Sequence, residues 1–407
     1  MKIFENFENV YGANHYDRQR VMVTKAEGCW LTDIEGKRYL DCLAAYSAVN
    51  QGHNHPYIKK YVMDTLDSNK GSVVSNVVYN ELSGEFLRKL SLMVPILSPN
   101  IPSYTNKVLL KNGGTESVET AIKAMRHFGW QKGIPDGKQE IIVFDNNFHG
   151  RMITIVSFSS SEKYREGFGP TTPGFIRVRY SDLSAVERSI NKYTCGILVE
   201  PMQGEGGMQI PKEGFLRGLR KIATENELML VFDEIQVGLG RTGKMFAFEH
   251  EGVVPDGLIL GKAISGGLIP MSAFITDDIT MNSIFTPGKD GSTYGGYPLA
   301  CAAGIAALTV IEEENLPQKS AEQGAKLLDT LKIMTKDLDC VKEVRGKGLF
   351  IGIEVKDGKA MEYCNKLLDQ GVFTNDSHGH TIRISPPLII NDQELHFLTS
   401  ALRRVLI

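Results

Sequence analysis

The sequence predicts an α/β fold with a large domain, built on a mostly parallel central sheet, and a second, smaller domain. The chain has 407 residues, more than one hydrophobic core usually accommodates. Through the middle of the chain, short apolar runs alternate with amphipathic segments, a pattern typical of parallel strands joined by crossover helices. From about Leu316 onward, two charged helical stretches and two strand-like pieces replace this pattern, so we expect the tail to form a separate small domain.

The strands of the large domain are predicted where the apolar runs have the length and composition of strands buried on both faces. One helix is predicted from Val118, Ala121, Ile122 and Met125, which recur at i, i+3, i+4 and i+7. A second helix-like segment covers residues 215–223. The predicted strands are residues 108–110, 141–144, 196–199, 228–232 and 258–260, followed in the tail by residues 349–355 and 381–384.

Composition and charge indicate an ordinary globular protein, with 42% apolar and 23% charged residues. The net charge of −3 gives no basic surface for nucleic acid or anionic lipid. No segment approaches the ~20 continuous apolar residues of a membrane helix, and the acidic N-terminus lacks a signal-peptide core. The six scattered cysteines form no C-x-x-C pair, which favours a reducing compartment. We therefore expect a cytoplasmic location.

A polar group follows four of the predicted strands. The first strand is followed by Lys-Asn-Gly-Gly-Thr and the third by Glu200. The fourth is followed by Asp233, and the fifth by Gly261 and Lys262. In an open parallel sheet, ligands bind beyond the carboxyl ends of the strands, so we expect these groups to converge on one site.

Lys262 is a candidate for covalent chemistry. A lysine at a buried strand end is costly unless it is paired or deprotonated, and a desolvated amine is a nucleophile toward aldehydes. Gly266 and Gly267 leave room beside it for a flat ligand. An Asp233 carboxylate placed against a pyridine nitrogen would keep that nitrogen protonated, and the pyridinium would draw electrons from a carbanion. Taken singly, the lysine more often extends to the surface and the aspartate more often caps a helix.

Two glycine-rich segments are candidates for binding a phosphate group. The segment 112–117, Asn-Gly-Gly-Thr-Glu-Ser, opens a predicted helix, where backbone N–H groups and hydroxyls form a phosphate cradle. The segment 291–296, Gly-Ser-Thr-Tyr-Gly-Gly, offers further hydroxyl groups. By itself, either segment fits an ordinary glycine turn equally well.

The segment Phe-His-Gly-Arg at residues 148–151 follows the second predicted strand. Phe148 or His149 is suited to stack on a flat ring. The Arg151 guanidinium is suited to bind a carboxylate through two parallel hydrogen bonds. The alternative is that Arg151 is an ordinary surface residue.

Three other patterns are weaker. The segment 238–243 fits G-x-G-x-x-G, but it neither follows its strand directly nor opens a clear helix, so nicotinamide binding is not predicted. The pairs His53-x-His55 and His378-x-His380 lack the second-ligand spacing of a familiar metal site. We therefore expect no metal and interpret these histidines as structural.

Taken together, these segments resemble the class III aminotransferases of the pyridoxal-phosphate (PLP) fold-type I family. Within the class, segments 11–16, 46–53, 291–296 and 378–387 are most similar to the ornithine δ-aminotransferases. The resemblance implies a PLP-binding domain at residues 51–315 and a small α+β domain built from both chain ends, residues 1–50 and 316–407. It rests on motifs that occur in one order along nearly the whole chain: Asn-Gly-Gly-Thr-Glu, Phe-His-Gly-Arg, Glu-Pro-Met-Gln-Gly-Glu, Phe-Asp-Glu-Ile-Gln, Gly-Lys-Ala and Ser-Thr-Tyr-Gly-Gly.

The resemblance also implies roles for single residues. Lys262 is expected to bind PLP as a Schiff base and to act as the catalytic base, and Asp233 is expected to pair with the pyridinium. Gln236 is expected to contact the ring hydroxyl. The remaining expected contacts are ring stacking by Phe148, cofactor contacts by His149 and Ser292, phosphate binding by Gly114, Thr115 and the partner subunit's Thr293, carboxylate binding by Arg151, an ornithine pocket shaped by Tyr16 and Tyr46, and a Glu205–Arg383 ion pair.

The implied function is that of a homodimeric enzyme that transfers the δ-amino group of L-ornithine to 2-oxoglutarate, giving glutamate-5-semialdehyde and glutamate. The alternatives within the class are acetylornithine, 4-aminobutyrate or lysine ω-aminotransferase. A glutamate-1-semialdehyde aminomutase would need no second substrate, and a PLP-binding regulator would not turn over. The chain departs from the family at Gly113, where many relatives carry Ser, so we expect phosphate binding to depend more on backbone donors.

Overall fold

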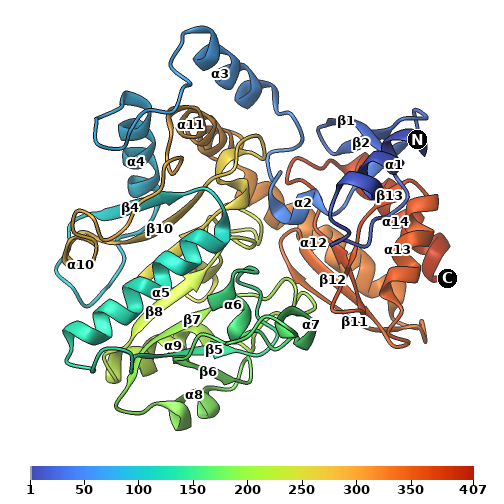
Figure 1. The fold of residues 1–407 in the computed structure, drawn as a ribbon. Helices are drawn as coiled ribbons and strands as arrows, with labels where there is room; N and C mark the ends of the chain where they lie inside the picture. Colours follow the sequence, from blue (N-terminus) through green and yellow to red (C-terminus); the bar gives the residue numbers. More distant parts are fainter. Residues whose placement is uncertain (1) are drawn as a thin grey trace.

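The computed structural model describes residues 2–407, which form a large part and a small part lying side by side (Figure 1). A seven-stranded sheet in the order β4-β10-β9-β8-β7-β5-β6 forms the centre of the large part. Strands β5 to β9 pair in parallel, whereas β10 runs antiparallel to both of its neighbours. The predicted α/β fold with a mostly parallel sheet is therefore confirmed. The strands are β4 (Asn106–Lys111), β5 (Glu140–Phe144), β6 (Phe175–Val178), β7 (Thr194–Val199), β8 (Met229–Asp233), β9 (Gly257–Leu260) and β10 (Ser272–Asp277).

Five of these strands coincide with the predicted apolar runs, and β6 and β10 are additional. Strand β6 lies at the edge of the sheet and is only partly buried, so it lacks a continuous apolar run. Strand β10 is fully buried but contains Ser272, Thr276 and Asp277. Their polar atoms are satisfied by specific partners; for example, the Ser98 hydroxyl donates to Asp277. Burial of polar side chains with matched partners is not visible in a hydrophobic pattern.

Helices cover both faces of the large sheet. The helix α5 (Gly114–Gln131) packs Val118 and Ile122 against one set of alternating strand residues, including Val143 and Val231. The helix α9 (Phe215–Glu225) packs against the other set, which includes Phe144. Because successive strand side chains point to opposite faces, the two helices lie on opposite sides. The other helices of this part are α3 (Pro56–Asp67), α4 (Glu81–Met93), α6 (Ile153–Ser157), α7 (Glu162–Arg165), α8 (Leu183–Ser189), α10 (Asp278–Ile284), α11 (Pro298–Glu313), η1 (Ala247–His250) and η2 (Lys262–Ser265).

The small part contains strands from both ends of the chain, as the blue and red ribbons of Figure 1 show. One sheet has the order β1-β2-β3-β13, in which the C-terminal β13 pairs in parallel with the N-terminal β3. The other has the order β11-β12-β15-β14. Its elements are α1 (Lys2–Tyr11), β1 (Val23–Glu27), β2 (Trp30–Asp33), β3 (Arg38–Asp41), α12 (Leu316–Thr335), β11 (Val341–Lys347), β12 (Phe350–Val355), α13 (Ala360–Asp369), β13 (Val372–Phe373), β14 (Asp376–Ser377), β15 (Thr381–Ile384) and α14 (Asp392–Leu406). The domain boundaries at residues 50 and 315 stay a prediction.

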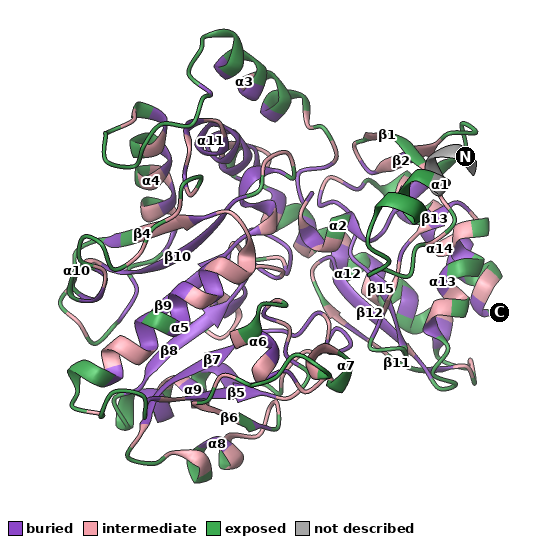
Figure 2. Ribbon diagram, in the orientation of Figure 1, coloured by how far each residue is buried: buried purple, intermediate pink, exposed green. Residues whose placement is uncertain are grey.

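Burial follows this architecture. The large sheet is buried between its helices, and most helices expose one face (Figure 2). The helix α11 is an exception because nearly all of its side chains are buried, which explains its apolar sequence all round. In residues 2–407 no helix is long and apolar enough to cross a membrane.

Candidate functional site

A cavity of about 430 Å³ lies beyond the carboxyl ends of β7, β8 and β9. Glu200, Asp233 and Lys262, which follow or end these strands, all line it. The groups predicted to converge from separate strand ends therefore do meet at one place. The candidate site residues that line the cavity are Gly114, Thr115, Phe148, His149, Asp233, Gln236 and Lys262.

Lys262 begins the short turn η2, directly after β9 and Gly261. Its φ of +48° lies in the left-handed region, which costs a residue other than glycine of the order of 1–2 kcal/mol and is often found at functional sites. Desolvation lowers the pKa of Lys262 to about 8, against the opposing charge of Glu205. Roughly a tenth of this amine is therefore neutral and nucleophilic near neutral pH, far more than at the ordinary pKa of 10.5.

Asp233 is fixed by a buried histidine. His149 Nδ1 lies 2.7 Å from Asp233 Oδ2, and the Ile235 N–H donates to Asp233 Oδ1 at 3.0 Å. Burial lowers the pKa of His149, but its hydrogen bond and the charge of Asp233 outweigh this and raise it above the ordinary value. His149 was expected to contact a cofactor. Its contact with Asp233 was not predicted, because the two residues are 84 positions apart in the sequence.

Glu200 is a further member of the site, and no role was predicted for it. Its Oε2 accepts a hydrogen bond from the Phe148 N–H at 3.0 Å, which positions the segment carrying Phe148 and His149. Burial raises the pKa of Glu200 to about 8, although the nearby His149 opposes the shift. Its place in the site was expected, because Glu200 directly follows a buried strand, but its contact with the Phe148 N–H was not predicted.

Several polar atoms at the cavity are buried and lack a hydrogen-bond partner within the described part of the chain. They are Thr115 Oγ1, Gln236 Nε2 and His149 Nε2. Two glycines leave space beside these residues. A Cβ on Gly204 would lie 1.7 Å from Gln236 Oε1, and one on Gly150 would lie 2.4 Å from Thr115 Oγ1. Thr115 also stands in the first turn of α5, where N–H groups favour an anion. These unpartnered polar atoms fit a planar cofactor with a phosphate group, such as PLP.

A buried cation lies close enough to the cavity for its charge to act on Lys262, although it does not line the cavity itself. Arg383, on β15, is 0% exposed, and its Nη2 donates to Glu205 Oε1 at 2.9 Å. Arg383 Nε and Nη1 have no partner among the described residues. The Tyr46 ring lies 5.0 Å from the guanidinium carbon, and Asn375 donates to the Tyr46 hydroxyl. The structure thus brings Tyr46, Glu205 and Arg383 together, each from a different part of the sequence.

Tyr46 is presented by a left-handed turn, α2 (Ala44–Ser47). All four residues have positive φ, with values of +48°, +46°, +58° and +72°. Each costs roughly 1–2 kcal/mol because none is glycine. Asp41 Oδ1 accepts hydrogen bonds from the N–H groups of Leu43 and Ala44 at 2.9 Å, and Asp41 Oδ2 contacts His53 Nε2 at 2.7 Å. These contacts hold the turn in its strained conformation.

Arg151 and Tyr16 are neighbours, but neither lines the cavity. The guanidinium carbon of Arg151 lies 5.9 Å from the Tyr16 ring and 5.9 Å from the Phe148 ring. Arg151 is exposed, and its closest aromatic neighbour is Tyr164 at 4.6 Å. Because Phe148 does line the cavity, Arg151 lies beside the cavity wall, where its Nη2 donates to the Tyr164 hydroxyl at 3.4 Å.

Ser292 and Thr293 do not line this cavity within the single chain. Thr293 is exposed, and Ser292 Oγ accepts a hydrogen bond from Asn112 Nδ2 at 3.2 Å. Their expected cofactor contacts stay a prediction that requires a second chain.

The glycine pattern at residues 238–243 has a structural explanation. Gly240 and Gly243 have φ of +92°, so the segment turns instead of opening a helix. Between them, Arg241 is fully buried and donates to the carbonyl groups of Leu349 and Pro386 at 2.9 and 2.6 Å. This segment therefore connects the large part to the small part.

Known proteins similar to this chain over nearly its whole length are aminotransferases. The Aminotransferase class-III family model matches residues 11–406. The ornithine aminotransferase of Brevibacillus brevis is 44% identical over 397 residues, which are 97% of this chain and 96% of that protein. A solved ornithine aminotransferase from Toxoplasma gondii, with partial occupancy of PLP at its active site, gives a TM-score of 0.94 at 33% identity and covers 100% of this chain and 93% of its own. The acetylornithine aminotransferase of Elizabethkingia anophelis gives a TM-score of 0.87 at 35% identity, covering 100% and 98%.

Proposed function

This chain belongs to the class-III aminotransferase family, and from that premise we propose that it transfers the δ-amino group of L-ornithine to 2-oxoglutarate with PLP as its cofactor. The products are glutamate-5-semialdehyde and glutamate. The observation that carries the choice of ornithine is the contact between the buried Arg383 and Glu205, which gives one pocket a cation that can be masked or freed.

The residues of the cavity supply the groups that this reaction requires. PLP, when bound, supplies an electron-withdrawing ring that stabilises a carbanion beside the transferred nitrogen. Asp233 and Gln236 would hold the ring, and the first turn of α5 at Gly114 and Thr115 would hold the phosphate. The Lys262 amine, with its pKa near 8, would attach the cofactor and move a proton at the reacting carbon.

Two different substrates must place different carbons at the same point. Glutamate carries two carboxylates, so it requires two cations, for which Arg151 beside the cavity wall and Arg383 in the interior are suited. Ornithine carries one carboxylate, and a free Arg383 would attract it into the wrong orientation. The Glu205 carboxylate at 2.9 Å masks that charge while ornithine binds, and Tyr46 and Tyr16 then contact its head group.

A homodimer is proposed on the basis of one exposed surface. Residues 73–79 place several large apolar side chains in solvent, including Val77 at 90% and Tyr79 at 108% relative exposure. A solvent-exposed apolar segment of this kind marks an interaction surface. Asn76, within the segment, donates to the Ser292 carbonyl at 2.7 Å, so the same surface includes the loop that carries Thr293. A second copy covering this surface would receive Thr293 at its phosphate group.

Two further expectations belong to the proposal. Residues 1–50 and 316–407 would form the small domain around the PLP-binding domain of residues 51–315, supported by the pairing of β3 with β13. A cytoplasmic location is supported by the six free cysteines, five of which are buried.

The proposal is tested by measuring the purified holoenzyme with 2-oxoglutarate and a panel of amine donors. We expect ornithine to give the highest kcat/KM, ahead of N-acetylornithine, 4-aminobutyrate and lysine, with one glutamate formed per ornithine consumed. A higher kcat/KM for N-acetylornithine would contradict the choice of ornithine. Sustained turnover of a single substrate without 2-oxoglutarate would indicate an aminomutase.

A further inference from the structure

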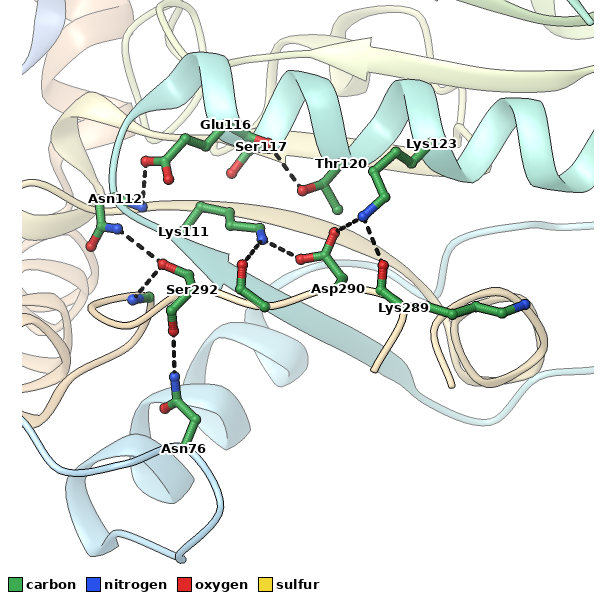
Figure 3. Close-up of polar contacts among 12 residues, drawn as sticks. Asn76, Lys111, Asn112, Glu116, Ser117, Thr120, Lys123, Lys289, Asp290 and Ser292 are labelled. Carbon is green, nitrogen blue, oxygen red and sulfur yellow. Dashed lines mark hydrogen bonds and ion pairs between the residues drawn. The ribbon is translucent and has the colours of Figure 1, made fainter. Parts of the chain in front are cut away.

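A cluster of three charges, two of them buried, fixes the loop 289–296 to the large sheet and to α5 (Figure 3). Lys111, the last residue of β4, contacts Asp290, and Lys123 Nζ on α5 lies 2.5 Å from the other Asp290 oxygen. The Lys111 and Asp290 side chains are each 7% exposed. Burial raises the pKa of Asp290, but its hydrogen bonds and charge interactions with the two lysines outweigh this and hold the pKa below its ordinary value. We call Lys111, Lys123 and Asp290 the loop cluster.

The loop cluster also binds the backbone of the loop. Lys111 Nζ donates to the Gly291 carbonyl at 3.0 Å, and Lys123 Nζ donates to the Lys289 carbonyl at 2.9 Å. Between α10 and α11 the described chain forms no helix or strand, so side chains from elsewhere must fix its course. Asn112 and Asn76 complete the attachment by donating to Ser292 Oγ and to the Ser292 carbonyl.

The attachment point is directly next to the cavity. Lys111 and Asn112 immediately precede Gly113–Thr115, and Asn112 itself lines the cavity. On the other side, the loop presents Thr293 to solvent, away from the cavity of its own chain. The carboxyl end of β4 therefore positions two groups. One is the predicted phosphate site at Gly114 and Thr115 of its own chain, and the other is Thr293, which is expected to reach the site of a second chain.

We propose that the loop cluster is a positioning device that acts across the dimer: Asp290, held by Lys111 and Lys123, fixes Thr293 for the phosphate bound by the partner subunit. The affinity of each site for the cofactor is then set in part by the loop cluster of the other subunit. The proposal rests on the proposed function, in that it requires PLP and a homodimer. The competing explanation is that the cluster only stabilises the fold.

Two variants separate positioning from stability. Asp290→Asn leaves the Lys111 ammonium buried without its charged partner, so it should lower the Tm of the apoenzyme. The double variant Lys111→Met with Asp290→Asn removes both buried charges, so it should recover most of that loss while the loop stays unattached. Lys132→Met is the matched control because Lys132 binds Glu227 at 2.7 Å near the opposite end of α5.

The dissociation constant for PLP is measured by titration of each apoenzyme, together with hydrogen exchange of residues 289–296. In the double variant we expect the Kd for PLP to rise about tenfold or more, the factor expected for losing one hydrogen bond to a charged group. Exchange at residues 289–296 should also be faster, and both quantities should be unchanged in the control. A double variant that recovers its Tm and also binds PLP as tightly as the wild type would overturn the proposal.

Hybrid dimers decide whether the effect crosses the interface. In each hybrid, one subunit carries Lys262→Ala, so only the other subunit can bind PLP covalently. PLP uptake at the intact Lys262 is measured by mass spectrometry after borohydride reduction of the adduct. Uptake should weaken when the double variant lies on the Lys262→Ala subunit and stay normal when it lies on the subunit with intact Lys262. The reverse result would overturn action across the dimer. If the wild-type protein took up no PLP, the proposed function would be wrong as well. If the wild type took up PLP normally and the hybrids took it up equally well, only the proposed role of the loop cluster would be wrong.

Discussion

Arg383 and Glu205 are 178 positions apart in the sequence, and Arg383 Nη2 donates to Glu205 Oε1 at 2.9 Å. The two side chains differ in environment, with 0% exposure for the arginine and 27% for the glutamate. Arg383 Nε and Nη1 find no partner in the described chain, so one carboxylate does not use all of its donors. A contact between a buried arginine and a partly exposed glutamate is suited to open for a second carboxylate.

Glu205→Ala tests whether this pair is a switch. Removing the glutamate leaves Arg383 unmasked for both substrates, so the half-reaction with ornithine should slow and the half-reaction with glutamate should accelerate. Single-turnover rates of the two half-reactions, measured separately, give the answer. If both rates fell by the same factor, the pair would be structural.

Asp233→Ala should keep the fold and lose most of the activity. Removing a charged partner in a buried site typically costs about 3–5 kcal/mol. If this loss falls on the transition state, kcat should decrease by roughly two to four orders of magnitude. Asp233→Asn is the comparison, since it retains the shape of the side chain near His149 without the charge. Near-normal turnover of both variants would mean that Asp233 only caps the following turn at Ile235.

Arg151→Lys should mainly damage the half-reaction with glutamate. The planar guanidinium binds a carboxylate through two parallel hydrogen bonds, whereas an ammonium presents a single point charge. Arg151 is exposed beside the cavity wall, so the substitution should leave the Tm almost unchanged. The ratio of the two single-turnover rates is the measurement, and an equal loss in both would argue against a role specific to glutamate.

The lowered pKa of Lys262 predicts how the apoenzyme reacts with PLP. The neutral amine is the reactive form, so covalent attachment should accelerate as pH rises through about 8 and then level off, well below the ordinary 10.5. Between pH 8 and 10.5, Lys262 is more protonated in the unfolded chain than in the folded chain. The contribution of Lys262 to the free energy of unfolding should therefore rise with pH over this range. Stopped-flow absorbance over pH about 6 to about 11 follows the attachment, and Lys262→Ala should show none. A midpoint near 10.5 would contradict the desolvated environment.

Ala45→Gly tests the left-handed turn that carries Tyr46. Ala45 has φ +46°, a conformation that glycine adopts without steric cost, so the free energy of unfolding should increase by up to about 1 kcal/mol. The neighbouring Ala48 has φ −79°, so Ala48→Gly should instead decrease it by roughly 0.5–1 kcal/mol. Denaturant unfolding of the two variants measures the difference. Equal destabilisation would mean that the turn is not left-handed in solution.

The sequence by itself determined the class of fold and the place of the site. Strands β5, β7, β8 and β9 were predictable because each is a short apolar run, and burial on both faces of a parallel sheet requires such runs. Strand β4 also has an apolar run, although it lies at the sheet edge and is only partly buried there. Asp233 and Lys262 were predictable as site residues because strand ends in such a sheet converge on one edge. The strands follow from the local pattern of apolar residues, and the site follows from the order of strands and helices along the chain. Both can be read from the sequence.

Only the tertiary structure decided which side chains touch. The contacts His149–Asp233, Glu205–Arg383 and Lys111–Asp290 join residues 84, 178 and 179 positions apart, and no local pattern records them. The left-handed turn at Ala44–Ser47 was equally invisible, because its residues disfavour positive φ and adopt it only where Asp41 and the surrounding contacts impose it. Pairings of this kind depend on the path of the whole chain, since a strained or buried polar group is stable only where distant segments supply its partners.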